Sequence, residues 1–339
     1  MSIHSYSRRH VLAGSASIFA SIAFLRRPAQ AAEITLRYGN DLYLTHPLNV
    51  RMREFADRLK VETNGQVELQ MFPDSQLGGD TEMLSQLRSG AIQVLSVPGG
   101  VLATLVPETS ITYVGYAFRH YKQVWEAMDG DLGAYCRAAI EKTGLSVMPA
   151  IWNNGFNDIY SSLRPINTPE DFVGFKVRTS VSPIFVSTFK SLGAAPTPIN
   201  LNEAYSALQT KLVDGVSDPL VIFESEKYYE VQKFASLTRQ MWGGYWLVIN
   251  PSTWTSFPKK TQEIFARLSS DAAAKQRADV AKLEVDVAAR LGTRGMIVNR
   301  PQPEAFIRKL HDTGFYAHWR KTFGEDGWRA LEKYAGHIG

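Results

Sequence analysis

The chain has 339 residues, of which 45% are hydrophobic and 21% are charged, with a formal net charge of +4 at pH 7. This length is sufficient for two globular domains with substantial cores. The single cysteine, Cys136, excludes an intrachain disulfide, and we expect it to be a buried small hydrophobe.

The first 31 residues have the pattern of a twin-arginine export signal. Arg8 and Arg9 precede an apolar run over 11–25, and Ala29-Gln30-Ala31 supplies the small residues of a cleavage site. The run is short for a membrane span of about 20 residues, which disfavours an N-terminal anchor. Cleavage after Ala31 removes four arginines and no acidic residue, so the mature chain has no basic surplus for nucleic acid. We expect a periplasmic protein, with the general secretory route as the alternative for export.

After the signal, stretches with strand periodicity alternate with stretches of helical periodicity. This β-α-β order predicts a mostly parallel sheet with right-handed crossovers, flanked by helices. In the first part of the chain, strands are expected at 33–39, 67–71, 92–97 and 145–151, and helices at 47–65, 80–90, 120–128 and 132–142.

The loop between the first strand and the first helix is a candidate ligand contact. It contains Asp41, Tyr43 and His46 and follows the carboxyl end of a strand, where open α/β sheets hold ligands. Capping of the helix start explains Asp41 and His46 equally well. Asp80 is expected to cap the second helix.

Trp152-Asn153-Asn154-Gly155-Phe156 is the expected crossing into a second domain, and Asn157 follows it. Each aromatic residue at the predicted crossings is by itself more typical of a core than of a pocket. As a group they suggest an aromatic-lined cleft, formed by Trp152, Phe156, Tyr160, Trp242, Tyr245 and Trp246.

Arg178 ends a short predicted strand, Gly174–Thr179, and Ser182-Pro183 opens the helix that follows. Later, the stretch Glu203–Gly215 combines a helix with a turn, and its strand leads to Asp218. Without further context, an arginine that ends a strand is more often a solvated surface residue.

Together these stretches resemble the DctP-like solute-binding proteins of tripartite ATP-independent periplasmic (TRAP) transporters. The resemblance covers nearly all of the mature chain and is most specific at Gly174–Arg178 and Ala207–Gly215. It implies a two-lobed α/β periplasmic binding fold, in which each lobe has a mixed, mostly parallel sheet flanked by helices. A long helix over 258–291 is implied to brace both lobes.

The resemblance also implies where the lobes begin and end. Lobe I is expected to comprise 32–151 plus about 240–275, and lobe II 152–239 plus about 276–339. Strands at 235–237 and 244–249 are expected to return the chain to lobe I, and helices at 304–319 and 327–334 to finish the fold.

In this family the strand arginine clamps the carboxylate of the ligand. The planar guanidinium of Arg178 suits that role, because its paired donors match the two oxygens of a carboxylate. Asn157 stands where many relatives have a second arginine, and Asp218 stands where relatives usually have asparagine. The other candidate ligand contacts are Asp41, Tyr43, Trp152, Asn154, Phe156 and Trp242.

Both departures from the family pattern disfavour a second carboxylate on the ligand, because it would be buried without a cationic partner. We therefore expect a small monocarboxylate with a hydroxyl or keto group, and an aromatic acid is the leading candidate. A dicarboxylate or a sugar acid is the alternative, since Arg37 or Arg239 would restore dicarboxylate binding by reaching the cleft.

The sequence contains no Gly-x-Ser-x-Gly elbow, Walker loop or dinucleotide fingerprint after the signal. We therefore expect no enzyme activity, no cofactor and no metal, and a monomer whose partners are an organic acid and TRAP membrane permease subunits. An exported enzyme and a sensor-linked binding protein are the rival hypotheses.

Overall fold

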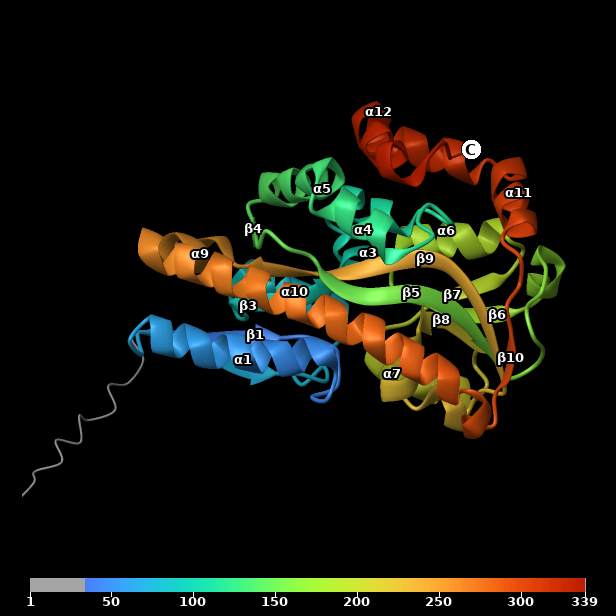
Figure 1. The fold of residues 1–339 in the computed structure, drawn as a ribbon, viewed down its shortest axis with the longest axis horizontal. Coiled ribbons are helices and arrows are strands. Elements are labelled where there is room, and N and C mark those ends of the chain that lie inside the picture. Colours follow the sequence, from blue (N-terminus) through green and yellow to red (C-terminus); the bar gives the residue numbers. More distant parts are fainter. Residues whose placement is uncertain (1–33, 339) are drawn as a thin grey trace, which may run out of the picture. The chain divides into compact units, whose positions relative to one another are not determined.

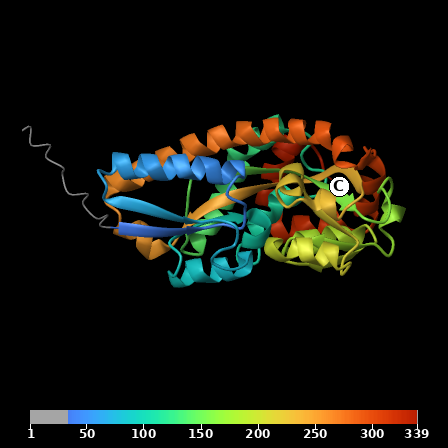
Figure 2. The same ribbon diagram turned by 90° about the horizontal axis from the view of Figure 1, so that it is seen from below.

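Ten strands form one mixed sheet in the computed structural model, which describes residues 34–338 (Figures 1 and 2). The predicted signal peptide and its cleavage site lie outside these residues. The strands are β1 Ile34–Gly39, β2 Val67–Phe72, β3 Val94–Pro98, β4 Ser146–Val147, β5 Trp152–Ser161, β6 Lys176–Thr179, β7 Ala195–Pro198, β8 Gly215–Pro219, β9 Phe234–Ile249 and β10 Ile297–Asn299.

Helices connect the strands and cover both faces of the sheet. The α-helices are α1 Pro47–Glu62, α2 Asp80–Ser89, α3 Gly99–Leu102, α4 Tyr121–Met128, α5 Asp131–Lys142, α6 Pro183–Ser191, α7 Leu201–Gln209, α8 Leu220–Ser225, α9 Pro251–Ser256, α10 Lys259–Arg290, α11 Glu304–Asp312 and α12 Phe315–Ala335. The 3-10 helices are η1 Pro107–Tyr113, η2 Pro169–Phe172, η3 Tyr228–Glu230 and η4 Gly292–Arg294.

The sheet has two parallel blocks joined by long antiparallel strands. The strand order is β2-β1-β3-β9-β5-β8-β6-β7. The first block pairs β1 in parallel with β2 and β3, and the second pairs β6 in parallel with β7 and β8. Strands β5 and β9 lie between the blocks and pair antiparallel with each other. The predicted α/β class with a mixed, mostly parallel sheet is confirmed, and the parallel character belongs to the blocks.

The two faces of the sheet carry separate hydrophobic cores. One core contains side chains of α2 to α6, α11 and α12, including the buried Cys136. The other contains side chains of α1, α7, α8 and α10. The alternating sequence of strands and amphipathic helices therefore forms a three-layer arrangement, with the sheet in the middle.

The long helix predicted over 258–291 is confirmed as α10. It packs against α1 beside the first block, against β5, and against α8 beside the second block. Figures 1 and 2 both show α10 running beside α1. Its 32 residues correspond to about 48 Å at 1.5 Å per residue, which is long enough to reach both blocks. The predicted lobe boundaries themselves stay a prediction.

Strand β9 is longer than predicted. The two short strands expected at 235–237 and 244–249 are one continuous element, because its backbone pairs with β3 near one end and with β5 over most of its length. Gly243 lies in the middle of β9, and a Cβ there would come within 2.3 Å of the ring of Tyr113. The glycine therefore permits a close approach and does not mark a break, which is why the prediction was wrong.

Other boundaries also differ from those predicted. The expected strand over 145–151 is only β4, and the chain then forms β5 from Trp152 onward. The final helices are divided at Gly314, with a positive φ of 74°, and α12 is also kinked at Gly324, with φ 73°, which agrees with the predicted interruption between 319 and 327. Among residues 34–338, no helix combines the length and apolar composition that a membrane crossing requires.

Candidate functional site

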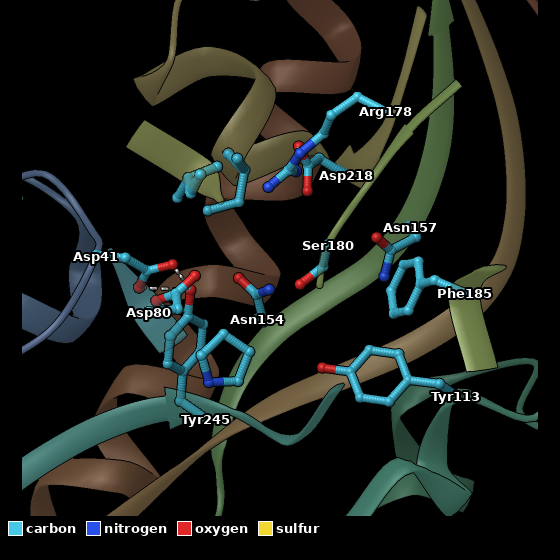
Figure 3. A pocket seen from close by; sticks show the side chains of 13 residues that line it. Asp41, Asp80, Tyr113, Asn154, Asn157, Arg178, Ser180, Phe185, Asp218 and Tyr245 are labelled. Carbon is cyan, nitrogen blue, oxygen red and sulfur yellow. Dashed lines mark hydrogen bonds and ion pairs between the residues drawn. The ribbon is translucent and has the colours of Figure 1, made fainter. Parts of the chain in front are cut away.

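A cavity lies where the carboxyl ends of strands from both blocks meet, and Figure 3 shows it from close by. Strands β1, β3, β6 and β8 all end at it, in agreement with the general position of ligand sites in open α/β sheets. Its lining residues are Asp41, Asp80, Pro98, Tyr113, Asn154, Asn157, Arg178, Ser180, Phe185, Leu201, Asp218, Ile222 and Tyr245.

Arg178 extends from β6 into the cavity and is only 2% exposed. Its Nε and Nη2 donate to the backbone oxygen of Ile199 at 3.0 and 2.8 Å, and its Nη1 donates to Oδ2 of Asp218 at 2.8 Å. A guanidinium has five N–H donors, so these contacts leave two of them available. Arg178 is thus held in a fixed orientation and still offers two donors to a ligand oxygen pair.

Asp218 lies near the end of β8 and forms a buried ion pair with Arg178. The hydroxyl of Tyr228 also donates to it, at 3.3 Å. Burial raises the pKa of Asp218, and the positive charge of Arg178 opposes that rise. The carboxylate of Asp218 therefore occupies one of the N–H donors of Arg178.

Two further carboxyl groups, those of Asp41 and Asp80, line the cavity at the end away from Arg178 (Figure 3). The hydroxyl of Tyr245 donates to both oxygens of Asp41, at 3.0 and 3.2 Å. Burial raises the pKa of Asp41 to about 6. Burial and the neighbouring charge of Asp41 raise the pKa of Asp80 well above its usual value. The two buried carboxyls disfavour each other's ionisation, because their negative charges would repel in a medium that screens them weakly.

Of the capping roles predicted at the first two helices, that of His46 is confirmed and that of Asp80 is not. His46 caps α1, since its Nδ1 accepts from the backbone N–H of Leu48 at 3.2 Å, and Asp41 is free to line the cavity. At α2, Gly79 occupies the N-cap position and Asp80 is the first residue of the helix. The expected capping role of Asp80 is therefore wrong, because its carboxyl points into the cavity.

Of the nine candidate binding residues, the structure brings five together around the cavity. These five are Asp41, Asn154, Asn157, Arg178 and Asp218. Tyr43 is 39% exposed and lies outside the lining. The sequence analysis did not select Asp80, Tyr113, Ser180 or Phe185 as ligand contacts. Ser180 could have been predicted, because it comes two residues after Arg178 and residues two apart in an extended chain face the same side.

The other three candidates, Trp152, Phe156 and Trp242, pack in the cores away from the cavity lining. Trp242 donates its Nε1–H to Asn153 Oδ1 at 3.0 Å and packs edge-on against Trp125. Whether any of the three contacts a ligand stays a prediction, but their packing gives each of them a structural role.

Among residues 34–338, Arg178 is the only basic residue that lines the cavity. Arg37 donates instead to the backbone oxygen of Ala91 at 3.2 Å, and Arg239 places its guanidinium over the ring of Phe156 at 3.9 Å. Within residues 34–338, no cluster of three or more His, Cys, Asp or Glu side chains is arranged to hold a metal ion.

Asp158 follows the cavity residue Asn157 and is buried on β5, where it accepts from the backbone N–H of Arg239 at 2.9 Å. Burial raises its pKa to about 7. A carboxyl with a raised pKa in the folded state contributes stability below its unfolded pKa. That contribution is lost as the pH rises from about 4 through 7.

We therefore expect Asp158→Asn to be more stable than the unchanged protein at alkaline pH. The difference should grow as the pH rises and reach the order of a few kcal/mol above pH 7, because the amide never has to ionise. Urea unfolding between about pH 5 and 8 measures it. The exposed Asp312→Asn is the control, and a constant difference across this range would contradict the assignment.

The chain matches the family model described as bacterial extracellular solute-binding protein, family 7 (DctP), over residues 41–331. It is 33% identical to the 2,3-diketo-L-gulonate-binding periplasmic protein YiaO of Escherichia coli, over 79% of this chain and 81% of the relative. It is 30% identical to the C4-dicarboxylate-binding periplasmic protein DctP of Rhodobacter capsulatus, over 74% and 75%.

Solved structures of TRAP periplasmic solute-binding proteins have the same fold. A protein from Sulfurospirillum deleyianum with bound succinate has a TM-score of 0.82 at 28% identity, and the match covers 91% of this chain and all of that one. A protein from Polaromonas bound to D-erythronate has a TM-score of 0.84 at 28% identity, over 90% and 99%. The predicted binding-protein fold is thereby confirmed.

Proposed function

Because this chain belongs to the DctP family, the bacterial extracellular solute-binding proteins of family 7, we propose that it captures a small hydroxylated monocarboxylate for a TRAP transporter. Family and structural relatives are solute-binding proteins and not enzymes. In this proposal the protein acts outside the cytoplasm as a monomer, after export and cleavage at Ala31, and delivers the acid to membrane permease subunits.

The observation that carries the proposal is the orientation of Arg178. Its guanidinium is buried and fixed by Ile199 and Asp218, and two N–H donors remain for a carboxylate. A bidentate contact of this kind is stronger and more specific than a contact to a single point charge. The carboxylate of the ligand would then share Arg178 with Asp218.

The composition of the lining favours a hydroxylated acid over a dicarboxylate. No second basic residue lines the cavity, so a second carboxylate would be buried without a cationic partner. Hydroxyl groups, in contrast, suit the polar side chains of Asn154, Asn157 and Ser180. Relatives named for 2,3-diketo-L-gulonate and D-erythronate support this class of ligand.

Two alternatives remain candidates. A dicarboxylate is supported by the C4-dicarboxylate-binding relative and by the relative with bound succinate. An aromatic acid, the leading expectation from the sequence, has less support, because Trp152, Phe156 and Trp242 lie outside the lining. Tyr113, Phe185 and Tyr245 are the aromatic residues that line the cavity.

Ligand entry requires the two blocks to separate. The cavity volume is about 30 Å³. Taking roughly 10–15 Å³ for each water molecule, this is room for about two or three waters and too little for an organic acid. The described conformation is therefore closed around Arg178, and hinge opening at the long strands between the blocks would admit the ligand.

Calorimetric titration of the mature protein tests the proposal. We expect D-erythronate or 2,3-diketo-L-gulonate to bind more tightly than succinate or benzoate, and D-glucose, which has no carboxylate, to give no signal. Ligand should also raise the unfolding temperature by mass action. Tight binding of succinate or benzoate alone would contradict the proposed ligand class, and absence of binding by every acid would contradict the proposed function.

A further inference from the structure

We propose that Asp41, Asp80 and Asn154 form a subsite for a hydrogen-bond donor group at the end of the ligand opposite its carboxylate. This inference rests on the proposed function and deepens it: the ligand would be a monocarboxylate whose far end carries hydroxyl groups or an ammonium group. All three side chains line the cavity, and in the view of Figure 3 they are drawn apart from Arg178 and Asp218.

Acceptor oxygens outnumber side-chain donors at this end. Asp41 and Asp80 contribute four oxygens, and both residues are only 4% exposed. The hydroxyl of Tyr245 donates to Asp41, and no side-chain donor among residues 34–338 bonds to Asp80 in the same way. The carboxyl of Asp80 therefore lines the cavity as an acceptor to which a ligand group can donate.

Asn154 provides an independent observation. It is 8% exposed, lines the cavity from β5, and lies between Asp80 and Ser180 in Figure 3. Its Oδ1 is buried without a hydrogen-bond partner among the described residues. Buried amide oxygens are nearly always hydrogen-bonded, so this oxygen indicates a donor that the ligand supplies.

The charges around the cavity indicate which ligand groups bind poorly at the subsite of Asp41, Asp80 and Asn154. Arg178 is the one cation of the lining, and Asp218 already pairs with it. Glu226 is also buried nearby, and burial together with the charges of Asp218 and Asp41 raises its pKa to about 8. A second carboxylate would approach several buried carboxyl groups without a cation, whereas a hydroxyl or ammonium group donates to them.

Two ligand pairs test the subsite, and in each pair only the terminal group changes. D-Gluconate and D-glucarate share a six-carbon polyhydroxy chain and differ by a terminal hydroxyl or carboxylate. 4-Aminobutyrate and succinate share four carbons and differ by a terminal ammonium or carboxylate. We expect the donor-bearing member of at least one pair to bind at least about tenfold more tightly, because the other member buries an unpaired charge.

The two pairs also distinguish the sources of the donor. A preference confined to gluconate assigns hydroxyl groups to the subsite, and one confined to 4-aminobutyrate assigns an ammonium group. Tighter binding of both glucarate and succinate than of their partners overturns the subsite while leaving the carboxylate-binding function intact. Failure of all four acids and of the acids named above to bind overturns the proposed function instead.

The variant Asp80→Asn provides the second test. It replaces one carboxyl oxygen by an amide N–H group, which donates to a carboxylate, so we expect the ratio of donor-ligand to dicarboxylate affinity to fall by about tenfold. Asp74→Asn, an exposed change in the loop before α2, is the matched control and should leave the ratio unchanged. The unfolding temperature establishes that each variant is folded, and Asp41→Asn replaces Asp80→Asn if the latter is not. An unchanged ratio in a folded variant overturns the subsite.

Discussion

Replacing Arg178 by alanine is expected to abolish measurable binding of the acid ligand, and Arg178→Lys is expected to weaken it nearly as much. Truncating one partner of a buried charge pair costs about 2–5 kcal/mol, which corresponds to at least about 30-fold in affinity. Lysine keeps the charge, but its single nitrogen cannot bond Ile199, Asp218 and a carboxylate in the geometry of a guanidinium. Calorimetry with D-erythronate and D-gluconate measures the loss.

The matched control is Arg37→Lys, the same substitution at an exposed arginine outside the cavity. It should change neither affinity nor stability appreciably. Thermal unfolding of the Arg178 variants separates lost binding from lost structure, because Asp218 loses its ion-pair partner in the alanine variant. Affinity of the folded lysine variant equal to that of the unchanged protein would disprove the bidentate contact.

Trp242→Ala is expected to lower the free energy of unfolding by about 3–5 kcal/mol, the usual cost of truncating a fully buried aromatic side chain. Trp242 is 1% exposed, and its ring packs edge-on against Trp125 and Phe118 at centroid distances of 5.5 and 6.4 Å. The change also leaves Asn153 Oδ1 without the indole donor. Chemical denaturation at constant pH measures the difference.

Two further variants establish what Trp242 does. Trp254→Ala removes a half-buried tryptophan of α9 and should cost clearly less stability. Trp242→Phe keeps most of the apolar volume and should retain ligand affinity, since the side chain does not line the cavity. If Trp242→Phe had normal stability but no longer bound ligand, Trp242 would be a ligand contact, as the sequence analysis had proposed.

The sequence predicted the parts of this fold that depend on local periodicity. The alternation of strands and helices over Ile34–Pro98 and the long helix α10 follow from the spacing of apolar residues within each segment. The local pattern alone favoured a surface position for Arg178, and the resemblance to the TRAP solute-binding proteins selected it as a ligand contact. Its burial in the cavity agrees with that prediction.

Errors arose where pairing between distant segments decided the outcome. The sequence predicted separate strands at 235–237 and 244–249, but β9 is continuous between them, because β5 pairs with Met241, Trp242 and Gly243. The aromatic residues at the crossings looked like a cleft lining as a group. Trp152, Phe156 and Trp242 pack in the cores, whereas Tyr245 lines the cavity, and whether the first three contact a ligand stays a prediction.

By itself, the sequence determined that an arginine fitted for a carboxylate stands at the end of a strand in an α/β chain of the solute-binding type. Only the tertiary structure decided what surrounds that arginine. Asp41 and Asp80 follow different strands, and Asp218 comes from the other parallel block, so no local pattern connects them. They meet because the order and register of the strands bring these carboxyl ends to one place. Strand order and register depend on the packing of the whole molecule.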